Sequence, residues 1–409
     1  MNGPDPFAAV PSIDDRRIAV RITKDALRHI RRGHPWIFDE SIVSESFGGR
    51  AGDLAVVFND DRKFVAIGLY DPDSPIRIRV LHRGKPTTVN VEFWRSKLAE
   101  AAEARAILTS SADTTGFRLV NGENDSLPGL VIDMYDGTAV IKLYSAAWFG
   151  HLAEVVEALG DHAQSVVLRL ARQVSKGDTF GLSDGQVLVG PLNDPVLFLE
   201  NGLTFEAHTL SGQKTGHFLD QRENRQQVRQ MSAGKRVLDV FSCTGGFSVY
   251  AAAGGATEVH SVDLSPQAIE AAVRNFEHNH DATVSCLHRT TVGDAFEVMA
   301  DMAKAKERYD IVVVDPPSFA QRAADSDRAI RAYKRLTHLA VRLVKPGGQL
   351  VQASCSSRVS AAAFFEAVAN AANDANVTLS DTGHTSHAVD HPIGFPEGAY
   401  LKALFATVG

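Results

Sequence analysis

Apolar and polar residues alternate over the first part of the chain. The alternating segments are residues 18–22, 54–58, 64–70 and 76–81, and turns rich in Gly, Asp and Asn separate them. Alternation with a period of two is typical of strands that bury one face. Residues 26–32 are the one helical piece. We therefore predict a small, mostly β module over residues 16–85, preceded by a disordered lead over residues 1–15.

A second pattern begins after the turn residues 84–88. Apolar residues recur with helical spacing over 91–108 and again over 148–159, whereas residues 130–135, 138–143 and 165–170 form short β-prone runs. Mixed periodicities of this kind indicate a domain in which helices pack against a β-sheet. We predict a middle α+β domain over residues 89–194.

From residue 195 onward, strands and helices alternate. A predicted hairpin over 196–207 is followed by strands at 236–241, 258–263, near 284, at 309–315 and at 348–353. Helices are predicted from residue 247, from residue 266 and over 327–343. This order predicts an α/β domain with a doubly wound, mainly parallel, Rossmann-like sheet over residues 195–409. Ligands of such sheets bind at the carboxyl ends of the strands.

Composition fits a globular protein of two or three domains. The chain has 409 residues, of which 44% are hydrophobic and 22% charged. It contains no run of 18 uncharged apolar residues, so we expect no membrane span, and residues 1–12 do not resemble a secretory signal. Three cysteines at spacings unsuited to zinc favour a reduced, cytoplasmic protein without a metal site.

Charge is unevenly distributed along the chain. The net charge is −7, which argues against a general nucleic-acid binder. The first 85 residues nevertheless carry 14 basic and 12 acidic residues, which leaves 28 basic and 37 acidic residues for the rest. Between Arg16 and Trp36, Asp25 is the only acid among seven basic residues. Such a cluster is either a phosphate-contacting surface or a solvated helix face.

The residues with chemical potential lie at the predicted strand ends. Small residues in the turn 241–247 allow close approach of the backbone to a ligand, and an acid ending the next strand accepts hydrogen bonds from both ribose hydroxyls. A further acid with Phe296 beside it suits an adenine amino group. The residues expected at the cofactor are Asp239, Phe241, Cys243, Gly245, Gly246, Asp263, Asp294 and Asp315.

This ordered set resembles the class I methyltransferase family. The dinucleotide fingerprint G-x-G-x-x-G is absent, whereas an acid, a Gly-Gly pair, two further acids and Asp315-Pro-Pro317 follow one another at successive strand ends. The resemblance implies S-adenosylmethionine as the cofactor.

Further segments are similar to one group, the PUA-domain 23S ribosomal RNA cytosine-C5 methyltransferases (large-subunit methyltransferase I family). They are residues 211–222 before the cofactor domain, 117–130 in the middle domain, and 32–38 and 52–70 in the first module. The resemblance implies an RNA-binding PUA module, ribosomal RNA as partner and a possible homodimer. It places Gln221 and Arg222 at the cofactor or target pocket, and Arg28, Arg31, Arg32, Lys214 and His217 at RNA.

Methylation of cytosine C5 requires a nucleophile, because C5 itself is unreactive. A thiolate that adds to C6 makes C5 enamine-like, so that C5 attacks a sulfonium methyl; a base then removes the C5 proton and the thiolate leaves. Cys355, in a Ser-Cys-Ser context just past the fifth strand, is the predicted nucleophile. Arg358 is expected to lower the pKa of its thiol.

Asp315 is expected to hydrogen-bond the N3/N4 edge of the cytosine. Another group of RNA cytosine-C5 enzymes has a second cysteine after the proline of this motif, but here the position is Ser318. Product release therefore needs another base, and the sequence leaves open whether Asp315 or water serves. Cys243 is interpreted as a packing residue and Cys286 as a core residue of the third strand.

Two alternatives remain open from the sequence. Asp-Pro-Pro motifs followed by an aromatic residue occur in enzymes that methylate exocyclic amines, although Ser318 fills the aromatic position here. A non-catalytic RNA-binding assembly factor is the second alternative. The target nucleotide, the oligomeric state and whether the RNA is free or in an assembling subunit are not encoded in any readable motif.

Overall fold

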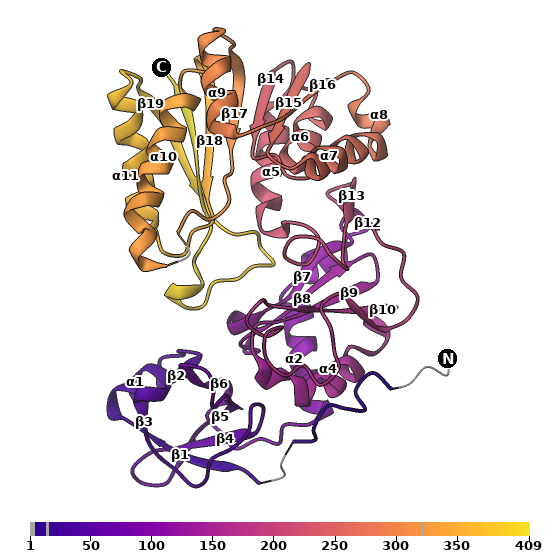
Figure 1. Ribbon diagram of the computed structural model, residues 1–409, viewed down its shortest axis with the longest axis vertical. Coiled ribbons are helices and arrows are strands. Elements are labelled where there is room, and N and C mark those ends of the chain that lie inside the picture. Colours follow the sequence, from indigo (N-terminus) through magenta and orange to yellow (C-terminus); the bar gives the residue numbers. More distant parts are fainter. Residues whose placement is uncertain (1–4, 14–15, 321) are drawn as a thin grey trace. The chain divides into compact units, whose positions relative to one another are not determined.

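The computed structural model describes residues 5–13, 16–320 and 322–409 (Figure 1). The chain divides into two compact units. The first comprises the chain up to Leu199 with Glu206–Leu219 and Asp390–Pro396, and the second comprises Glu200–Phe205, Asp220–Val389 and Glu397–Gly409. The predicted domain over 195–409 differs from this division, because residues 195–199, Glu206–Leu219 and Asp390–Pro396 group with the N-terminal part.

The first unit begins with the predicted β module. Its six-stranded sheet has the order β2-β6-β5-β4-β1-β3, in which only the pairing of β1 with β4 is parallel. Thr23 caps α1 by accepting a hydrogen bond from the backbone N–H of Ala26. The elements are β1 Ile18–Ile22, α1 Lys24–Arg31, β2 Trp36–Phe38, β3 Ile42–Glu45, β4 Leu54–Phe58, β5 Phe64–Tyr70 and β6 Ile76–Arg83.

The middle region adds a five-stranded sheet of order β11-β10-β9-β8-β7. The predicted helix over 91–108 is two helices, because Arg105 turns inward between them and pairs with Asp125 at 2.6 Å. The elements are α2 Val91–Glu103, α3 Ala106–Thr109, β7 Gly116–Asn121, β8 Leu130–Tyr135, β9 Thr138–Leu143, α4 Leu152–Leu159, β10 Ser165–Leu170 and β11 Gln186–Val189, with 3₁₀ turns at Ala146–His151 and elsewhere.

These two sheets share one hydrophobic core. Leu54, Ile67 and Leu81 of the first sheet belong to the same buried cluster as Trp94 and Trp148 of the middle region. Residues 84–88 connect the two sheets without dividing the core. Because side chains from both sheets are removed from water in the same cluster, their burial stabilises the two sheets together.

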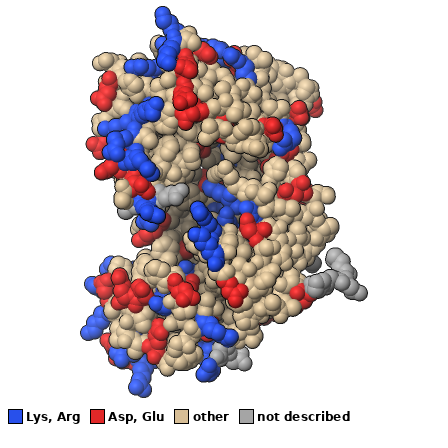
Figure 2. Space-filling view, viewed as in Figure 1, with Lys and Arg blue, Asp and Glu red and all other residues tan. Residues whose placement is uncertain are grey.

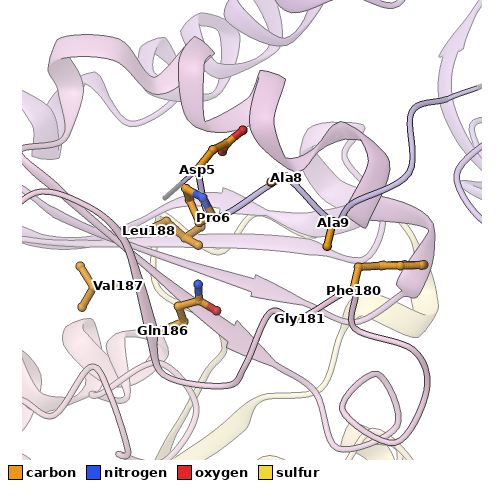
Figure 3. A pocket seen from close by; sticks show the side chains of 9 residues that line it. All are labelled: Asp5, Pro6, Ala8, Ala9, Phe180, Gly181, Gln186, Val187 and Leu188. Atoms are coloured by element: carbon orange, nitrogen blue, oxygen red, sulfur yellow. The ribbon is translucent and has the colours of Figure 1, made fainter. Parts of the chain in front are cut away.

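Part of the predicted disordered lead is ordered. Phe7 and Val10 pack against the shared core, and the side chains of the lead segment line a hollow of about 390 Å³ together with Phe180 and residues 186–188 (Figure 3). The predicted disorder is wrong for residues 5–13, because apolar side chains of this segment pack against the hydrophobic core of the first unit. Residues 1–4 and 14–15 of the predicted lead lie outside the described residues.

Segment Asp390–Pro396 also belongs to the first unit. The carboxylate of Asp390 accepts a hydrogen bond from the backbone N–H of Arg118 at 2.8 Å, and its carbonyl accepts one from the Arg105 guanidinium at 3.1 Å. Asn124 Oδ1 accepts from the Gly394 N–H at 2.7 Å, and the Phe395 ring lies edge-on to Trp36. The segment is therefore an integral part of this unit.

The second unit is a seven-stranded sheet of order β16-β15-β14-β17-β18-β20-β19. Strands β14 to β18 are parallel, and β20 runs antiparallel to both of its neighbours. The strands are β14 Arg236–Val240, β15 Glu258–Asp263, β16 Leu287–Val292, β17 Tyr309–Val314, β18 Val344–Ser354, β19 Leu379–Thr385 and β20 Lys402–Val408; β12 Val196–Glu200 and β13 Leu203–Ala207 form the preceding hairpin.

Helices cover both faces of this sheet (Figure 1). One face carries α9, α10 and α11, whose apolar side chains form a core with the central strands. The other helices are α5, α6, α7 and α8. The helices are α5 Arg222–Met231, α6 Gly246–Ala253, α7 Pro266–His278, α8 His280–Thr283, α9 Ala295–Lys304, α10 Ser326–Ala340 and α11 Ala361–Asp374. The predicted doubly wound α/β sheet is confirmed.

The strand order locates the ligand crevice. Consecutive strands run outward from β14 to β16, and the chain then crosses back so that β17 lies on the other side of β14. The carboxyl ends of β14 and β17 flank this reversal, which is where open α/β sheets bind ligands. One strand differs from the prediction: Val284 follows α8, and the third strand begins only at Leu287.

Candidate active site

The turn after β14, residues 241–245, has the backbone shape expected of a ligand cradle. Phe241 and Cys243 have positive φ values of 63° and 49°, and Gly245 has a φ of 77°. A Cβ on Gly245 would lie 2.8 Å from Cβ of Ala272, so a side chain there would strain the backbone and collide with α7. We call this segment the cofactor turn.

Asp263 anchors the cofactor turn. Its two carboxylate oxygens each accept a hydrogen bond at 2.9 Å, one from the Cys243 N–H and one from the Ser265 N–H. The carboxylate is half-buried, and an ionised carboxylate has acceptor positions beyond these two. The next side chain, Leu264, is apolar yet 70% exposed. An acid beside an exposed apolar side chain suits a ribose with its attached base.

Asp239 lies deeper than predicted. Its side chain is fully buried, and one oxygen accepts a hydrogen bond from Ser248 Oγ at 2.6 Å, whereas the other has no hydrogen-bond partner within the described residues. Burial raises the pKa of this carboxyl to about 7, although the hydrogen bond from Ser248 opposes the shift. The predicted direct contact of Asp239 with the cofactor is wrong for this arrangement, because no surface of the side chain is accessible. The carboxylate instead bonds Ser248, a residue of α6.

Asp294 is exposed and caps α9. Its Oδ1 accepts hydrogen bonds from the N–H groups of Phe296 at 2.9 Å and Glu297 at 3.2 Å. The helix N-terminus and the following Phe296 ring therefore stand at the end of β16, beside the ends of β15 and β14 in sheet order. Asp263, Asp294 and the cofactor turn are thus brought to one edge of the sheet, as predicted.

Asp315 begins the motif after β17 and is held by Gln221. Gln221 Nε2 donates a hydrogen bond to Asp315 Oδ2 at 2.9 Å, and Gln221 Oε1 accepts one from Asn224. Asn224 in turn accepts a hydrogen bond from Thr385 at 2.6 Å. Gln221 and Arg222 are buried at the start of α5, so the amide of Gln221 fixes the direction of the Asp315 carboxylate.

Cys355 follows β18, the strand next to β17. Its half-buried thiol lies 3.8 Å from the carbonyl oxygen of Pro316, in the Asp315-Pro-Pro317 motif. Residues 355–359, which we call the thiol loop, therefore face the motif that the sequence connects to the target base. Arg358 is exposed in this loop, and its carbonyl accepts a hydrogen bond from Ser326 Oγ at 3.3 Å.

A buried ammonium lies beneath the thiol loop. Lys402 begins β20 directly opposite Ser354, and its Nζ donates to the carbonyls of Ser356, Val359 (2.7 Å) and Tyr400 (3.1 Å). Burial lowers the pKa of Lys402 to about 8, and the negative charge of the Cys355 thiolate opposes this shift. Arg358 was expected to have this electrostatic effect; the cation that contacts the loop of Cys355 from inside is Lys402, which bonds the Ser356 and Val359 carbonyls.

The remaining cysteines have other surroundings. Burial raises the pKa of Cys243 to about 11, and the charges of Asp263, Asp315 and Asp239 act in the same direction. Cys286 is half-buried just before β16 and makes no part of the strand. Its predicted position in a core strand is wrong, because that strand starts one residue later and its outer face is largely exposed.

The residues predicted at RNA fall into two groups. Arg28, Arg31 and Arg32 are exposed on and after α1, as a contact surface requires. Lys214 is half-buried, with its Nζ 4.4 Å from the centre of the Phe218 ring. His217 is only 5% exposed and packs against Phe198. Its predicted contact with RNA phosphate is therefore wrong, because the imidazole lies inside the first unit.

Two contributors were missed in the sequence. Lys402 is the one charged residue in the apolar run 401–406, and a lone lysine within a buried strand was the available signal. Leu264 directly follows an acid at a strand end, a position at which an exposed leucine has no packing role. A lysine or a leucine does not by itself indicate a functional site. The position of Lys402 next to the thiol loop follows only from the pairing register of β18 and β20.

Comparisons with known proteins agree with this geometry. Residues 183–404 match the S-adenosylmethionine-dependent methyltransferase family, and residues 20–83 match the PUA-like domain. The ribosomal RNA large subunit methyltransferase of Deinococcus radiodurans is 46% identical over 405 residues, covering 97% of this chain and 99% of the relative. Ribosomal RNA large subunit methyltransferase I of Pseudoalteromonas translucida is 35% identical, covering 93% of this chain and 97% of that protein.

A solved Streptococcus mutans chain assigned as a SAM-dependent methyltransferase has the same fold. It superposes with a TM-score of 0.78 at 22% identity, over 95% of this chain and 99% of that one. The predicted PUA-like module and cofactor domain are confirmed by these matches. The chain belongs to the S-adenosylmethionine-dependent methyltransferases, within the PUA-domain family of the ribosomal RNA large subunit methyltransferases I.

Proposed function

We propose that this protein methylates C5 of a cytosine in large-subunit, 23S ribosomal RNA through a transient covalent bond to Cys355. The names of the relatives supply the class of RNA. The observation that carries the chemistry is the thiol of Cys355, half-buried and 3.8 Å from the Pro316 carbonyl, next to the Asp315 motif. A cytosine-C5 enzyme needs a nucleophile and a base-recognising acid at one place.

The residues around the cofactor turn fit S-adenosylmethionine. The backbone of the turn leaves the space that a Cβ on Gly245 would fill, Asp263 retains acceptor positions for ribose hydroxyls, and Leu264 offers an apolar face to the adenine. Asp294 has an exposed carboxylate for the adenine amino group. When bound, the cofactor supplies an electrophilic sulfonium methyl group.

The protein's own residues then act on the cytosine. The Cys355 thiolate adds to C6, which forms an S–C6 bond and breaks the C5–C6 double bond. Asp315, held by Gln221, hydrogen-bonds the N3/N4 edge and stabilises the protonated ring as C5 becomes nucleophilic. C5 takes the methyl group, a base removes the C5 proton, and the S–C6 bond breaks to restore the double bond and the thiolate.

The product of the reaction tests this proposal. Purified protein is incubated with S-adenosylmethionine and protein-free 23S ribosomal RNA, and the RNA is digested to nucleosides for mass spectrometry with chromatographic standards. We expect 5-methylcytidine at one position. Formation of N4-methylcytidine would support the exocyclic-amine alternative, and absence of any methylated nucleoside would support the non-catalytic one.

The covalent step has its own test. In RNA that contains 5-fluorocytidine, C5 bears fluorine in place of hydrogen. After methyl transfer, C5 therefore has no proton for a base to remove, and the adduct persists. We expect a protein–RNA species that survives a denaturing gel with wild-type protein and disappears with Cys355→Ala. The Cys243→Ala variant is the matched control and should retain the adduct. Loss of the adduct in Cys243→Ala alone would reverse the assignment.

A further inference from the structure

The outer face of α10 concentrates positive charge in the otherwise acidic second half of the chain. Within Ser326–Ala340 the charged residues are Asp327 and four cations. Arg328, Arg331 and Arg335 are spaced by three and four residues, so they lie on one side of the helix, with Lys334 beside them. All three arginines are exposed. We call Arg328, Arg331, Lys334 and Arg335 the α10 basic face.

Internal partners account for only two of these four cations. Arg328 pairs with Asp325 at 3.3 Å and the Arg335 guanidinium lies 4.6 Å above the Phe296 ring. Within the described residues, Arg331 and Lys334 have no acidic partner. Figure 2 shows Lys and Arg side chains gathered where α10 lies. Cations without partners on a folded surface are available to an anionic ligand.

The face starts at the proposed reaction site. The chain leaves the carboxyl end of β17, and α10 returns it to the start of β18, so the N-terminal end of α10 lies at the ligand-binding edge. The bond from Ser326 Oγ to the carbonyl of Arg358 ties that end to the thiol loop. At the other side, Arg335 touches Phe296, two residues after Asp294. The basic face therefore runs away from the rim along one side of the cofactor domain.

We propose that the α10 basic face binds the phosphate backbone of the substrate RNA as it leaves the proposed target site. This inference rests on the proposed function and adds a second RNA contact, separate from the PUA-like module. Arginine suits the role because its planar guanidinium donates two parallel hydrogen bonds to a phosphate. Four cations along one side of a helix match the successive phosphates of an RNA backbone better than they match a single small anion.

Binding measurements test this surface. The double variant Arg331→Glu/Lys334→Glu and the control Arg172→Glu/Lys176→Glu change the net charge equally; the control residues are exposed in the first unit. Affinity for protein-free 23S ribosomal RNA is measured at several salt concentrations. We expect the α10 variant to bind at least 10-fold more weakly, with a log–log salt slope reduced by about 1.5, and the control to bind like wild type.

The outcomes separate the two proposals. Equal affinities and slopes for the α10 variant and wild type would overturn the inference while leaving the methylation proposal intact. If wild type itself did not bind the RNA, the proposed substrate would fall as well. S-adenosylmethionine affinity measured by calorimetry should be unchanged in the α10 variant, which shows that the cofactor domain is folded.

A second, independent observation concerns Lys402. An ammonium has three N–H donors, and all three of those on Lys402 are directed to backbone carbonyls, two of them in the thiol loop. Its side chain is 4% exposed. With its donors used in this way, Lys402 is not placed to carry protons, but its charge is held beside the loop in a buried setting where charges act strongly.

We infer that Lys402 is a positioning residue for the proposed nucleophile: it fixes the thiol loop and provides the positive charge that favours the Cys355 thiolate. Ionisable groups with an electrostatic effect in this region include Asp315 and Tyr333. Burial raises the pKa of Tyr333, and the charges of Cys355 and Asp315 add to that shift, so the phenol stays neutral. Asp315 disfavours a second negative charge, whereas the positive charge of Lys402 favours the thiolate.

The pH profile of thiol alkylation tests Lys402. In protein that carries Cys243→Ser and Cys286→Ser, the rate of reaction with iodoacetamide reports Cys355 alone. We expect Lys402→Met to shift the midpoint of this profile upward by about one pH unit, which corresponds to a tenfold smaller thiolate fraction below the midpoint. Lys402→Arg should retain most of the wild-type profile, because it keeps the charge.

A purely structural role would give another result. If Lys402→Met lowered the melting temperature but left the midpoint of alkylation in place, the electrostatic part of the inference would be wrong. If neither changed, the positioning part would be wrong too. Should the methionine variant fail to fold, Lys402→Gln, which retains donors without charge, gives the same comparison. Because alkylation needs no RNA, these outcomes do not depend on the substrate.

Discussion

Two loops at the same edge of the sheet each contain a cysteine, and only one of the two cysteines has a buried ammonium among its neighbours. In the cofactor turn, burial raises the pKa of Cys243 to about 11, and the charges of Asp263, Asp315 and Asp239 act in the same direction. In the thiol loop, Cys355 has the ammonium of Lys402 below it. The comparison teaches that position at a strand end does not make a thiol reactive. Burial and the neighbouring acids disfavour the Cys243 thiolate, whereas Cys355 has an ammonium among its neighbours.

The largest effect is expected when the two cysteines are replaced by alanine one at a time, which removes one thiol in each variant. Cys355→Ala should reduce kcat by more than about 10³-fold, because no covalent activation of C5 remains. Cys243→Ala should stay within about fivefold of wild type. Methyl transfer to 23S ribosomal RNA from labelled cofactor measures both. Activity in Cys355→Ala would leave the exocyclic-amine mechanism as the better account.

A smaller effect is expected at the acid between the two loops. Asp315→Asn keeps the shape and a partner for Gln221 but removes the charge. We expect kcat to fall about 10²-fold, within the range for loss of one acid–base or charge-stabilising group. The Cys355 adduct with 5-fluorocytidine RNA should form more slowly. A variant as active as wild type would exclude Asp315 from the reaction.

The anchor of the cofactor turn should affect binding more than chemistry. Asp263→Ala removes the acceptor for the Cys243 and Ser265 N–H groups and the proposed ribose contact. Hydrogen bonds to a charged group contribute about 1.5–3 kcal/mol, so the Kd for S-adenosylmethionine should rise about 10- to 100-fold by calorimetry. Cys355→Ala is the control and should bind the cofactor like wild type. Equal loss in both variants would contradict the division of roles between the loops.

The smallest effect concerns stability and Asp239. Because the folded protein keeps the proton of this carboxyl up to about pH 7 and the unfolded chain releases it near pH 4, wild type loses stability as the pH rises between these values. Asp239→Asn avoids this loss. We expect the variant to gain about 2–3 kcal/mol relative to wild type between pH 5 and pH 8, at about 1.4 kcal/mol per pH unit up to pH 7.

Denaturant unfolding at both pH values measures this difference. The Asn side chain can still accept the hydrogen bond from Ser248, so that contact is matched in the two proteins. A stability difference that does not depend on pH would show that the buried carboxyl is already ionised at pH 5 in the folded state.

Local patterns explain which parts of the fold could be predicted. Strand ends carry their acids within the sequence itself, so Asp263, Asp294 and Asp315 were placed at one edge from strand order and periodicity alone. Lys402 could not be placed, because its relation to Cys355 depends on the antiparallel register in which it faces Ser354. That register joins strands that are separated along the chain by α11, β19 and the loop 386–401, and no local spacing encodes it.

Burial was the other limit. His217 was interpreted as a phosphate contact because it is polar and lies near Lys214, but a tertiary contact with Phe198 buries it. Asp239 was expected at the ligand because it ends the first strand of the sheet, but its side chain is fully buried. The lead residues Phe7 and Val10 were expected to be disordered, since their neighbours are Pro, Gly and Asp. In each case the decisive partner is distant in the sequence.

Segment Asp390–Pro396 has a consequence for synthesis of the chain. Asp390 bonds Arg118 and Arg105, which precede it by 272 and 285 residues, and Asn121 and Asn124 bond the same segment. Domains usually fold as units while the chain emerges, N-terminal part first. Here the first unit is completed only after residues 390–396 have left the ribosome, long after its other segments. Until then the buried Arg105 and Asn121 side chains lack part of their final partners.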